Sequence, residues 1–224
     1  MALERLRCGM GENGETGFRR VGGRLCLDFV NTVGEWAGSA GAARTRDWQD
    51  RAERERLTSY RALLDWAVFT GVVTRAEARR LGDAAAKHPR RAAAVLARAL
   101  ELRRATYRLL RASLAGWKPD AADVALLDRE LRVARQHQRL DAALPLTTSW
   151  DDDDHALDRV LWPVVLDAAE LLAGADRARV GQCPGEGCGW MFLDTSRGRR
   201  RKWCDMADCG NVAKVRRFRQ REAA

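Results

Sequence analysis

Four cysteines near the C-terminal end are spaced as two metal-binding pairs. Cys183 and Cys188 are separated by four residues, fifteen residues follow, and Cys204 and Cys209 repeat the four-residue gap. Zinc takes four ligands at tetrahedral corners, about 2.3 Å from each thiolate. Two short-range pairs supply these ligands at little entropic cost, because each pair closes only a small loop. We therefore expect one structural Zn²⁺ at this site.

Zinc at this site is expected to act as a folding element. A segment of this size buries too little apolar surface to fold alone, and metal binding contributes on the order of 10–16 kcal/mol in finger peptides. Loss of any one ligand should therefore unfold the module. Four thiolates leave no open coordination position, so the metal should not activate water. Two disulfides or four ordinary buried thiols are the alternative. The other two cysteines, Cys8 and Cys26, fit no ligand spacing.

The rest of the sequence favours a reducing compartment and no membrane span. No apolar run approaches the roughly 18 residues that a spanning helix needs, and residues 1–17 lack the apolar core of a secretory signal. A cytoplasmic location is the expectation. Clustered cysteines bind metal there more often than they form disulfides.

The charge balance points to a polyanionic partner. Forty Lys and Arg residues against 31 Asp and Glu residues give a formal net charge of +9, which suits nucleic acid but also fits a protein with Arg-rich surface helices. Residues 181–224 stay net positive after the four thiolates and Zn²⁺ are counted. The candidate DNA-contacting residues of this segment are Arg197, Arg199, Arg200, Arg201, Lys202, Lys214, Arg216, Arg217 and Arg221.

The last helix is expected to have an apolar stripe and a basic face. At 100° per residue, Val212, Val215 and Phe218 share one stripe, which should pack on the protein. Lys214, Arg217 and Arg221 lie together on another face of the helix, and this face could approach phosphates or enter a major groove. Two alternatives stay open: a basic tail that only aids solubility or docks on the rest of the chain, and a zinc-stabilised protein-interaction module that uses Trp190, Trp203 or Phe218.

Asp28 and Asn31 interrupt an otherwise apolar segment. A buried Asp needs partners, so Asp28 either joins a core hydrogen-bond network with an Arg or, with Asn31, lines a ligand pocket. Five aromatic residues could wall such a pocket or fill the core: Trp36, Trp66, Tyr107, Trp150 and Trp162.

The remaining polar clusters have simpler interpretations than catalysis. Asp151–Asp154 with His155 could bind metal, but aspartates before a helix more simply cap its free N–H groups. His88, His137 and His155 lie far apart in the sequence and are expected at the surface. No phosphate-cradling glycine loop, catalytic carboxylate pair or nucleophile motif is present, so we do not expect an enzyme.

The predicted fold class is mainly α with a small β-sheet. Hydrophobic periodicity predicts helices at 59–70, 74–87, 90–114 and 120–137, and a helix carrying the apolar positions of 157–172. Ser59 and a Thr74–Glu77 capping box are expected to start two of these helices, and Gly116 to end a third. Residues 24–32 are expected to be a buried strand or strand-to-helix start, 37–56 a loop leading into a polar helical stretch, and 138–150 a β-hairpin. Strands at 189–194 and 200–203 and a helix at 212–221 would give the zinc module a treble-clef-like arrangement.

Three stretches of the C-terminal segment resemble the CGNR zinc finger. They are residues 188–197, CGWMFLDTSR, residues 201–206, RKWCDM, and residues 209–217, CGNVAKVRR. The resemblance implies zinc binding by the four cysteines and DNA binding by the finger. The family's name-giving Arg is replaced by Val212 here, so a DNA contact must rest on the other basic residues.

The preceding part resembles the ABATE domain, which usually precedes this finger. Residues 22–32, GGRLCLDFVNT, match its opening, and residues 161–164, LWPV, with the apolar positions that follow match its closing helix. The resemblance implies a stress-related bacterial transcription regulator whose larger domain senses an unknown ligand or partner. Regulators often act as symmetric dimers, so a homodimer is a separate expectation. The expected organisation is a flexible N-terminus at 1–17, a mostly helical domain at 18–175 and the finger at 181–221.

Overall fold

The computed structural model describes residues 17–36, 52–142, 144–151 and 156–222. The elements, in chain order, are α1 Leu25–Val30, β1 Val33–Trp36, β2 Ala52–Glu55, α2 Tyr60–Thr70, α3 Arg75–Lys87, α4 Pro89–Ala115, α5 Ala121–Gln136, β3 Gln138–Asp141, β4 Thr147–Trp150, α6 Trp162–Ala173, β5 Val180–Gln182, β6 Met191–Leu193 and α7 Asn211–Glu222. Short helical turns lie at η1 Leu157–Leu161, η2 Ala175–Arg179 and η3 Met206–Gly210. The protein is mainly helical with small antiparallel sheets, as expected.

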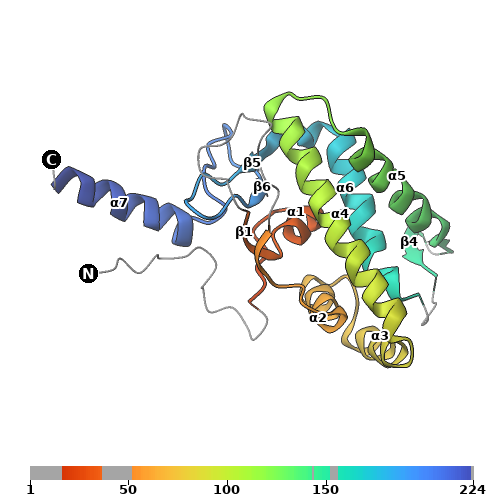
Figure 1. Ribbon diagram of the computed structural model, residues 1–224. Coiled ribbons are helices and arrows are strands. Elements are labelled where there is room, and N and C mark those ends of the chain that lie inside the picture. Colours follow the sequence, from red (N-terminus) through yellow and green to blue (C-terminus); the bar gives the residue numbers. More distant parts are fainter. Residues whose placement is uncertain (1–16, 37–51, 143, 152–155, 223–224) are drawn as a thin grey trace.

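The long helix α4 organises the helical part. It packs against α1, α2, α3, α5 and α6, and Figure 1 shows α4, α5 and α6 side by side. The predicted caps are present: Ser59 accepts the Ala62 N–H at the start of α2, and Thr74 and Glu77 form a capping box at the start of α3. Gly116 ends α4 with a φ of 69°, a left-handed conformation that glycine adopts without a Cβ penalty.

Two predictions for the first part of the chain are wrong. Residues 25–30 form the helix α1, so neither a strand nor a strand that leads into a helix lies here. A short apolar run does not distinguish a strand from a buried helix, and α1 is enclosed by α4, α6 and β6, which suits a helix that is apolar on most sides. Residues 52–55 form β2, which pairs with β1, where a loop and polar helix were expected.

A buried ion pair explains why the charged segment 52–55 is a strand. Arg103 of α4 is fully buried, and it donates to both carboxylate oxygens of Glu55 and to the Thr32 hydroxyl at 2.9 Å. Burial raises the pKa of Glu55, but the hydrogen bonds and charge of Arg103 outweigh it and hold the pKa below its ordinary value. Unpaired buried charges are costly, so this contact holds β2 against the domain.

The zinc segment contains a turn between Cys183 and Cys188, the expected first strand and the expected terminal helix. The expected strand at 200–203 is absent. Strand β6 pairs instead with β5, from Val180 opposite Leu193 to Gln182 opposite Met191. A side chain takes the place of the backbone hydrogen bonds that a second strand would have made. The Asp194 carboxylate accepts the N–H groups of Ser196 at 2.8 Å and Arg201 at 3.0 Å. The treble-clef arrangement stays a prediction.

The helical part and the zinc segment share one hydrophobic core. A single cluster of buried residues runs from α2 through α1 and β1 to β6 and the four cysteines. The side-chain amide of Asn31 pairs with both backbone groups of Met191, donating to its carbonyl at 2.8 Å and accepting its N–H at 2.9 Å. This one buried side chain therefore completes the free edge of β6.

Backbone contacts extend the same seam. The Trp36 N–H donates to the Cys188 carbonyl at 3.0 Å, and the Leu193 N–H donates to the Gly22 carbonyl at 2.7 Å. The buried Trp190 indole donates to the Val33 carbonyl at 3.1 Å. At the expected boundary between 175 and 181 the chain therefore passes from the helical part to the zinc segment, but the two parts stay packed against each other.

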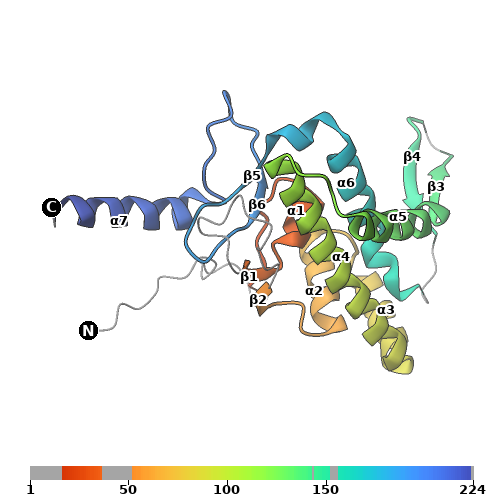
Figure 2. The same ribbon diagram turned by 45° about the horizontal axis from the view of Figure 1, so that its top comes forward.

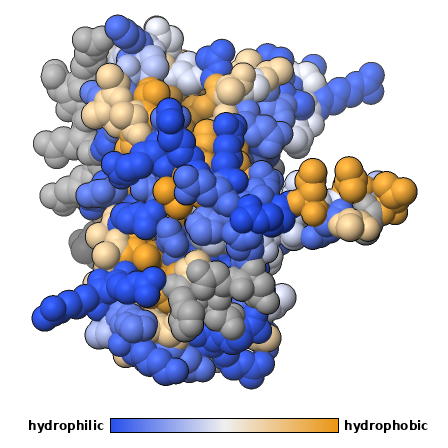
Figure 3. All heavy atoms as spheres, turned by 90° about the vertical axis from the view of Figure 1, so that its right-hand side faces the viewer, coloured by the Kyte–Doolittle hydropathy of each residue, from blue (hydrophilic) through white to orange (hydrophobic). Residues whose placement is uncertain are grey.

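Two elements project from this body at opposite ends. Helix α7 extends away on one side, and the predicted β3–β4 hairpin extends from the other (Figure 2). Leu140, Leu144 and Leu146 of the hairpin are 69%, 92% and 61% exposed, and Figure 3 shows apolar side chains gathered on a projection of that face.

Within the described residues, no helix has the length and apolarity to cross a membrane.

The substitution Asn31→Ala tests the seam. It leaves the N–H and carbonyl of Met191 buried without these partners, which should lower the unfolding free energy by about 2–4 kcal/mol. Urea unfolding of the zinc-loaded protein measures this loss. Asn211→Ala, which truncates an exposed side chain, is the control. Equal effects of the two substitutions would contradict the assigned role of Asn31.

Candidate metal centre and nucleic-acid interface

The four predicted cysteines meet at one buried point. The sulfur atoms of Cys183, Cys188, Cys204 and Cys209 all lie within 4.8 Å of one another. The Cys188–Cys204 and Cys204–Cys209 sulfur distances are 3.6 and 3.7 Å. A tetrahedron with Zn–S bonds of about 2.3 Å has edges of about 3.8 Å. The donor set therefore fits one structural Zn²⁺, with no coordination position left for a water molecule.

Each cysteine is positioned by a local turn. Cys183 follows β5 directly and donates its N–H to the Trp190 carbonyl at 2.8 Å, while the Cys188 N–H closes a turn onto the Gly185 carbonyl at 3.1 Å. A Cβ atom on Gly185 would lie 3.0 Å from the Cys209 sulfur, so a larger residue there would crowd the ligand. Cys209 lies in η3, whose start is capped by Asp205 through the Ala207 N–H.

The sulfur cluster favours the thiolate form of Cys183. Hydrogen bonds from the thiols of the other three cysteines are the main cause that holds the pKa of Cys183 far below its ordinary value, and they outweigh the opposing effect of burial. Zinc is bound by deprotonated cysteine. The electrostatics of the site and its geometry therefore point to the same ligand set.

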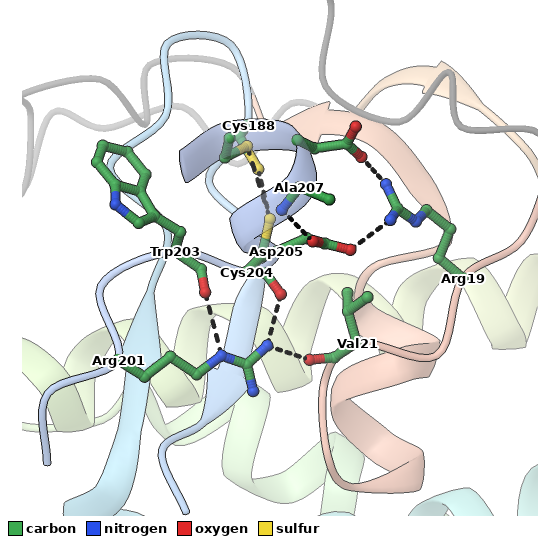
Figure 4. Close-up of polar contacts among 10 residues, drawn as sticks. Arg19, Val21, Cys188, Arg201, Trp203, Cys204, Asp205 and Ala207 are labelled. Atoms are coloured by element: carbon green, nitrogen blue, oxygen red, sulfur yellow. Dashed lines mark hydrogen bonds and ion pairs between the residues drawn. The ribbon is translucent and has the colours of Figure 1, made fainter. Parts of the chain in front are cut away.

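Two arginines fasten the metal centre to the helical part (Figure 4). Arg19 forms ion pairs with Asp205, which precedes η3, and with Asp208 inside it. Arg201 donates to four backbone carbonyls, those of Val21, Leu193, Trp203 and Cys204. Its guanidinium also lies over the Phe192 ring, 4.6 Å from the ring centroid. Arg201, a candidate DNA contact from sequence, is thus occupied inside the protein.

The other candidate cations lie on the surface. Arg197, Arg199, Arg200 and Lys202 are exposed around the turn after β6. Lys214, Arg216, Arg217 and Arg221 are exposed on α7, where Arg216 forms an ion pair with Glu186. The structure therefore leaves two basic groups accessible: the turn and the projecting helix.

The expected packing of α7 is wrong. None of its residues is buried, and Val215 and Phe218 are 38% and 61% exposed. The helix contacts the zinc segment through its first turn and through Arg216, which pairs with Glu186. Half-buried Val212 lines a groove of about 240 Å³ beside Trp203 and Cys209. The helix starts at a zinc ligand, so the metal fixes its origin while the rest extends into solvent (Figure 1).

Asp28 and Asn31 have different environments. Asp28 lines a cavity of about 480 Å³ together with Arg20, Arg24 and Trp150. Its carboxylate accepts the Gly22 N–H at 2.7 Å. Asn31 does not reach this cavity, because its amide is paired with Met191. Of the aromatic residues considered, Trp150 lines the cavity, while Trp36, Trp66, Tyr107 and Trp162 are buried in the core.

The acidic cluster before η1 has no metal-site geometry in its described part. The Asp151 carboxylate contacts the His137 ring at 3.2 Å and Arg139, so it closes the β3–β4 hairpin and does not cap a helix. His137 also stacks on Trp162 and is only partly exposed. Residues 152–155 lie outside the described ranges, as do residues 1–16 with Cys8. Among the described residues, the four cysteines are the one group placed to hold a metal.

Sequence reasoning missed Arg19 and Asp167. Asp167 of α6 accepts from the Arg24 guanidinium at 2.7 Å and from the Cys26 N–H at 2.8 Å, and so anchors the start of α1. An acidic residue within the apolar stripe of 157–172 was a usable signal. Arg19 carried no such signal, because its partners lie about 186 residues away in the sequence.

Burial makes the stability of the fold depend on the charge of Asp28. Desolvation raises its pKa from 3.8 to about 6, despite the Gly22 N–H and the charge of Arg20. An acid whose folded pKa is raised is favourable when protonated, so this contribution is lost as pH rises from about 4 through 6. The unfolding free energy of the wild type should therefore fall relative to Asp28→Asn by up to about 3 kcal/mol over that range.

Urea unfolding at a series of pH values measures the difference between the two proteins. The Asn side chain keeps an oxygen for the Gly22 N–H, so packing is retained. Asp83→Asn, at an exposed position on α3, is the control. A difference between wild type and Asp28→Asn that does not change with pH would contradict this account.

Comparisons with known proteins agree with the geometry. Residues 179–222 match the model of the CGNR zinc finger. Residues 23–175 match the ABATE model, described as "Putative stress-induced transcription regulator". The search of curated proteins finds no match. Because the second match covers more than half of the chain, this protein belongs to the ABATE family and carries a C-terminal CGNR zinc finger.

Proposed function

We propose that this protein is a bacterial transcription regulator that binds DNA through its zinc finger and senses a small ligand in its helical domain. The observation that carries the proposal is the projecting helix α7, which is unburied and basic. An α-helix with its side chains is about 10–12 Å across, which matches a major groove about 12 Å wide. Lys214, Arg217 and Arg221 would meet the phosphates that flank the groove.

Four of the five acidic residues between Gly181 and Ala224 already have partners, so they leave most of this charge accessible. Asp205 and Asp208 pair with Arg19, and Glu186 pairs with Arg216. Asp194 accepts from Ser196 and from the Arg201 N–H. The cations of the turn and of α7 therefore set the field that an approaching polyanion meets.

The cavity beside Asp28 is the candidate sensor site. It is bounded by the segment 20–25, by residues 70–72 after α2, and by Trp150 and Pro163. Arg20 and Gly23 of that segment also line the cleft on the finger side. A ligand that displaces this segment would thus act on both sites. Such a shared wall is the physical connection that a ligand-responsive regulator needs.

A second candidate function, protein interaction, rests on the apolar stripe of α7. Val215 and Phe218 are exposed beside the groove lined by Val212 and Trp203. Trp190 cannot contribute, because it is buried. Helix-in-groove recognition uses apolar positions at this spacing. Many regulators form homodimers. For a second copy of this chain, the most exposed large apolar side chains among the described residues are those of the β3–β4 hairpin.

Salt-dependent DNA binding distinguishes these functions. Each phosphate contact adds about 0.9 to the slope of log K against log salt concentration. Replacing Lys214, Arg217 and Arg221 by Gln should therefore lower the slope by about 2–3 units. Fluorescence anisotropy with duplex DNA between 50 and 200 mM salt measures it.

The control replaces three exposed arginines at the far end of the molecule, Arg75, Arg79 and Arg90, by Gln. This variant loses the same formal charge and should keep the wild-type slope. Absence of any DNA affinity at 50 mM salt, or an equal loss of slope in both variants, would contradict the proposed DNA-binding role of α7.

A further inference from the structure

A cleft lies where the finger meets the helical domain. We propose that it binds a backbone phosphate of the nucleic acid and that Arg20 of the helical domain is one of its ligands. The inference rests on the proposed function, because the phosphate belongs to DNA that the finger binds. It adds a contact from the domain to which no DNA contact was assigned.

The cleft has walls from both parts of the chain. Its volume is about 770 Å³, within the range of pockets that hold small ligands. One wall is the segment before α1, with Arg20, Val21 and Gly23, and the other is the finger, with Arg200, Lys202 and Trp203. Trp203 also lines the groove under α7. One residue therefore borders both the cleft and the groove beside the helix proposed to enter DNA.

Three cations of the cleft are available to a ligand. Arg20, Arg200 and Lys202 are exposed, and none of their side chains has a hydrogen bond or ion pair to another described residue. Arg20 has only an electrostatic interaction with Asp28, behind the cleft wall. The acid of the cleft, Asp205, is paired with Arg19. The accessible charge is thus positive, as an oxyanion requires.

The walls are fixed before a ligand arrives. Arg201 donates to the Val21 carbonyl of one wall at 2.7 Å and to the Cys204 carbonyl of the other (Figure 4). Arg19 joins the same two segments through Asp205 and Asp208. A site that is already assembled loses less conformational entropy on binding. Two arginines hold the cleft together, while Arg20, Arg200 and Lys202 line it and are exposed.

The test is the salt dependence of DNA binding by Arg20→Gln. Loss of one phosphate contact should lower the slope by about 0.9 and weaken binding roughly five- to tenfold at 0.1 M salt. Arg20→Lys keeps the charge and should stay within about twofold of the wild type. Arg79→Gln, on the exposed face of α3, is the matched control. Thermal unfolding of each variant verifies that the fold is intact.

The outcomes separate this inference from the proposed function. If the wild type binds DNA and Arg20→Gln keeps its slope and affinity, the inference is wrong and the finger binds alone. If the wild type has no DNA affinity at low salt, the proposed function fails and the inference fails with it.

Competition by 1 mM pyrophosphate at constant ionic strength should displace little DNA from the wild type. Strong displacement in the wild type but not in Arg20→Gln would identify a small-phosphate site and overturn the assignment to DNA.

Discussion

The paired hydrogen bonds between Asn31 and Met191 are the contact on which the rest of the structure depends. One side-chain amide acts here as the missing neighbour of strand β6, with both bonds buried. Strand β6 leads from Cys188 to the basic turn, and its partner β5 leads into Cys183. The position of two zinc ligands relative to the helical domain therefore depends on this residue at the end of α1, together with the backbone contacts of Trp36 and Leu193.

The zinc ion and two arginines complete this arrangement. The metal joins the turn between Cys183 and Cys188, which follows β5, to η3, after which α7 starts. Arg19 and Arg201 close the outer side of the seam, so they strengthen the junction and are withdrawn from any ligand. The cations that remain accessible lie at the turn, on α7 and at Arg20. Structural and binding roles are thus divided among neighbouring arginines of the same segment.

Local signals in the sequence predicted the local parts of the structure. Cysteine spacing predicted the metal centre, and Ser59, Thr74 and Gly116 predicted helix ends that the structure contains. The family resemblance to ABATE and to the CGNR finger is confirmed by the matched residues. These features depend on residues a few positions apart, where the physical rules of capping and coordination act directly.

The errors arose where distant partners decide the structure. Helix α1 and strand β2 are set by neighbours from α4 and α6, which no local pattern contains. The arginines of the finger have the same residue type but different roles, and only the fold shows that Arg201 points at carbonyls while Arg200 is exposed. Helix α7 has an amphipathic pattern, but its stripe has no packing partner among the described residues, so the pattern did not predict burial.

Hydrogen exchange with and without zinc tests the central claim that finger and helical domain form one cooperative unit. Amides of β6 and of α1 should lose protection together when a chelator removes the metal, because they share one core and the Asn31 contact. Re-addition of zinc should restore both. Loss confined to residues 183–222, with α1 still fully protected, would contradict the account.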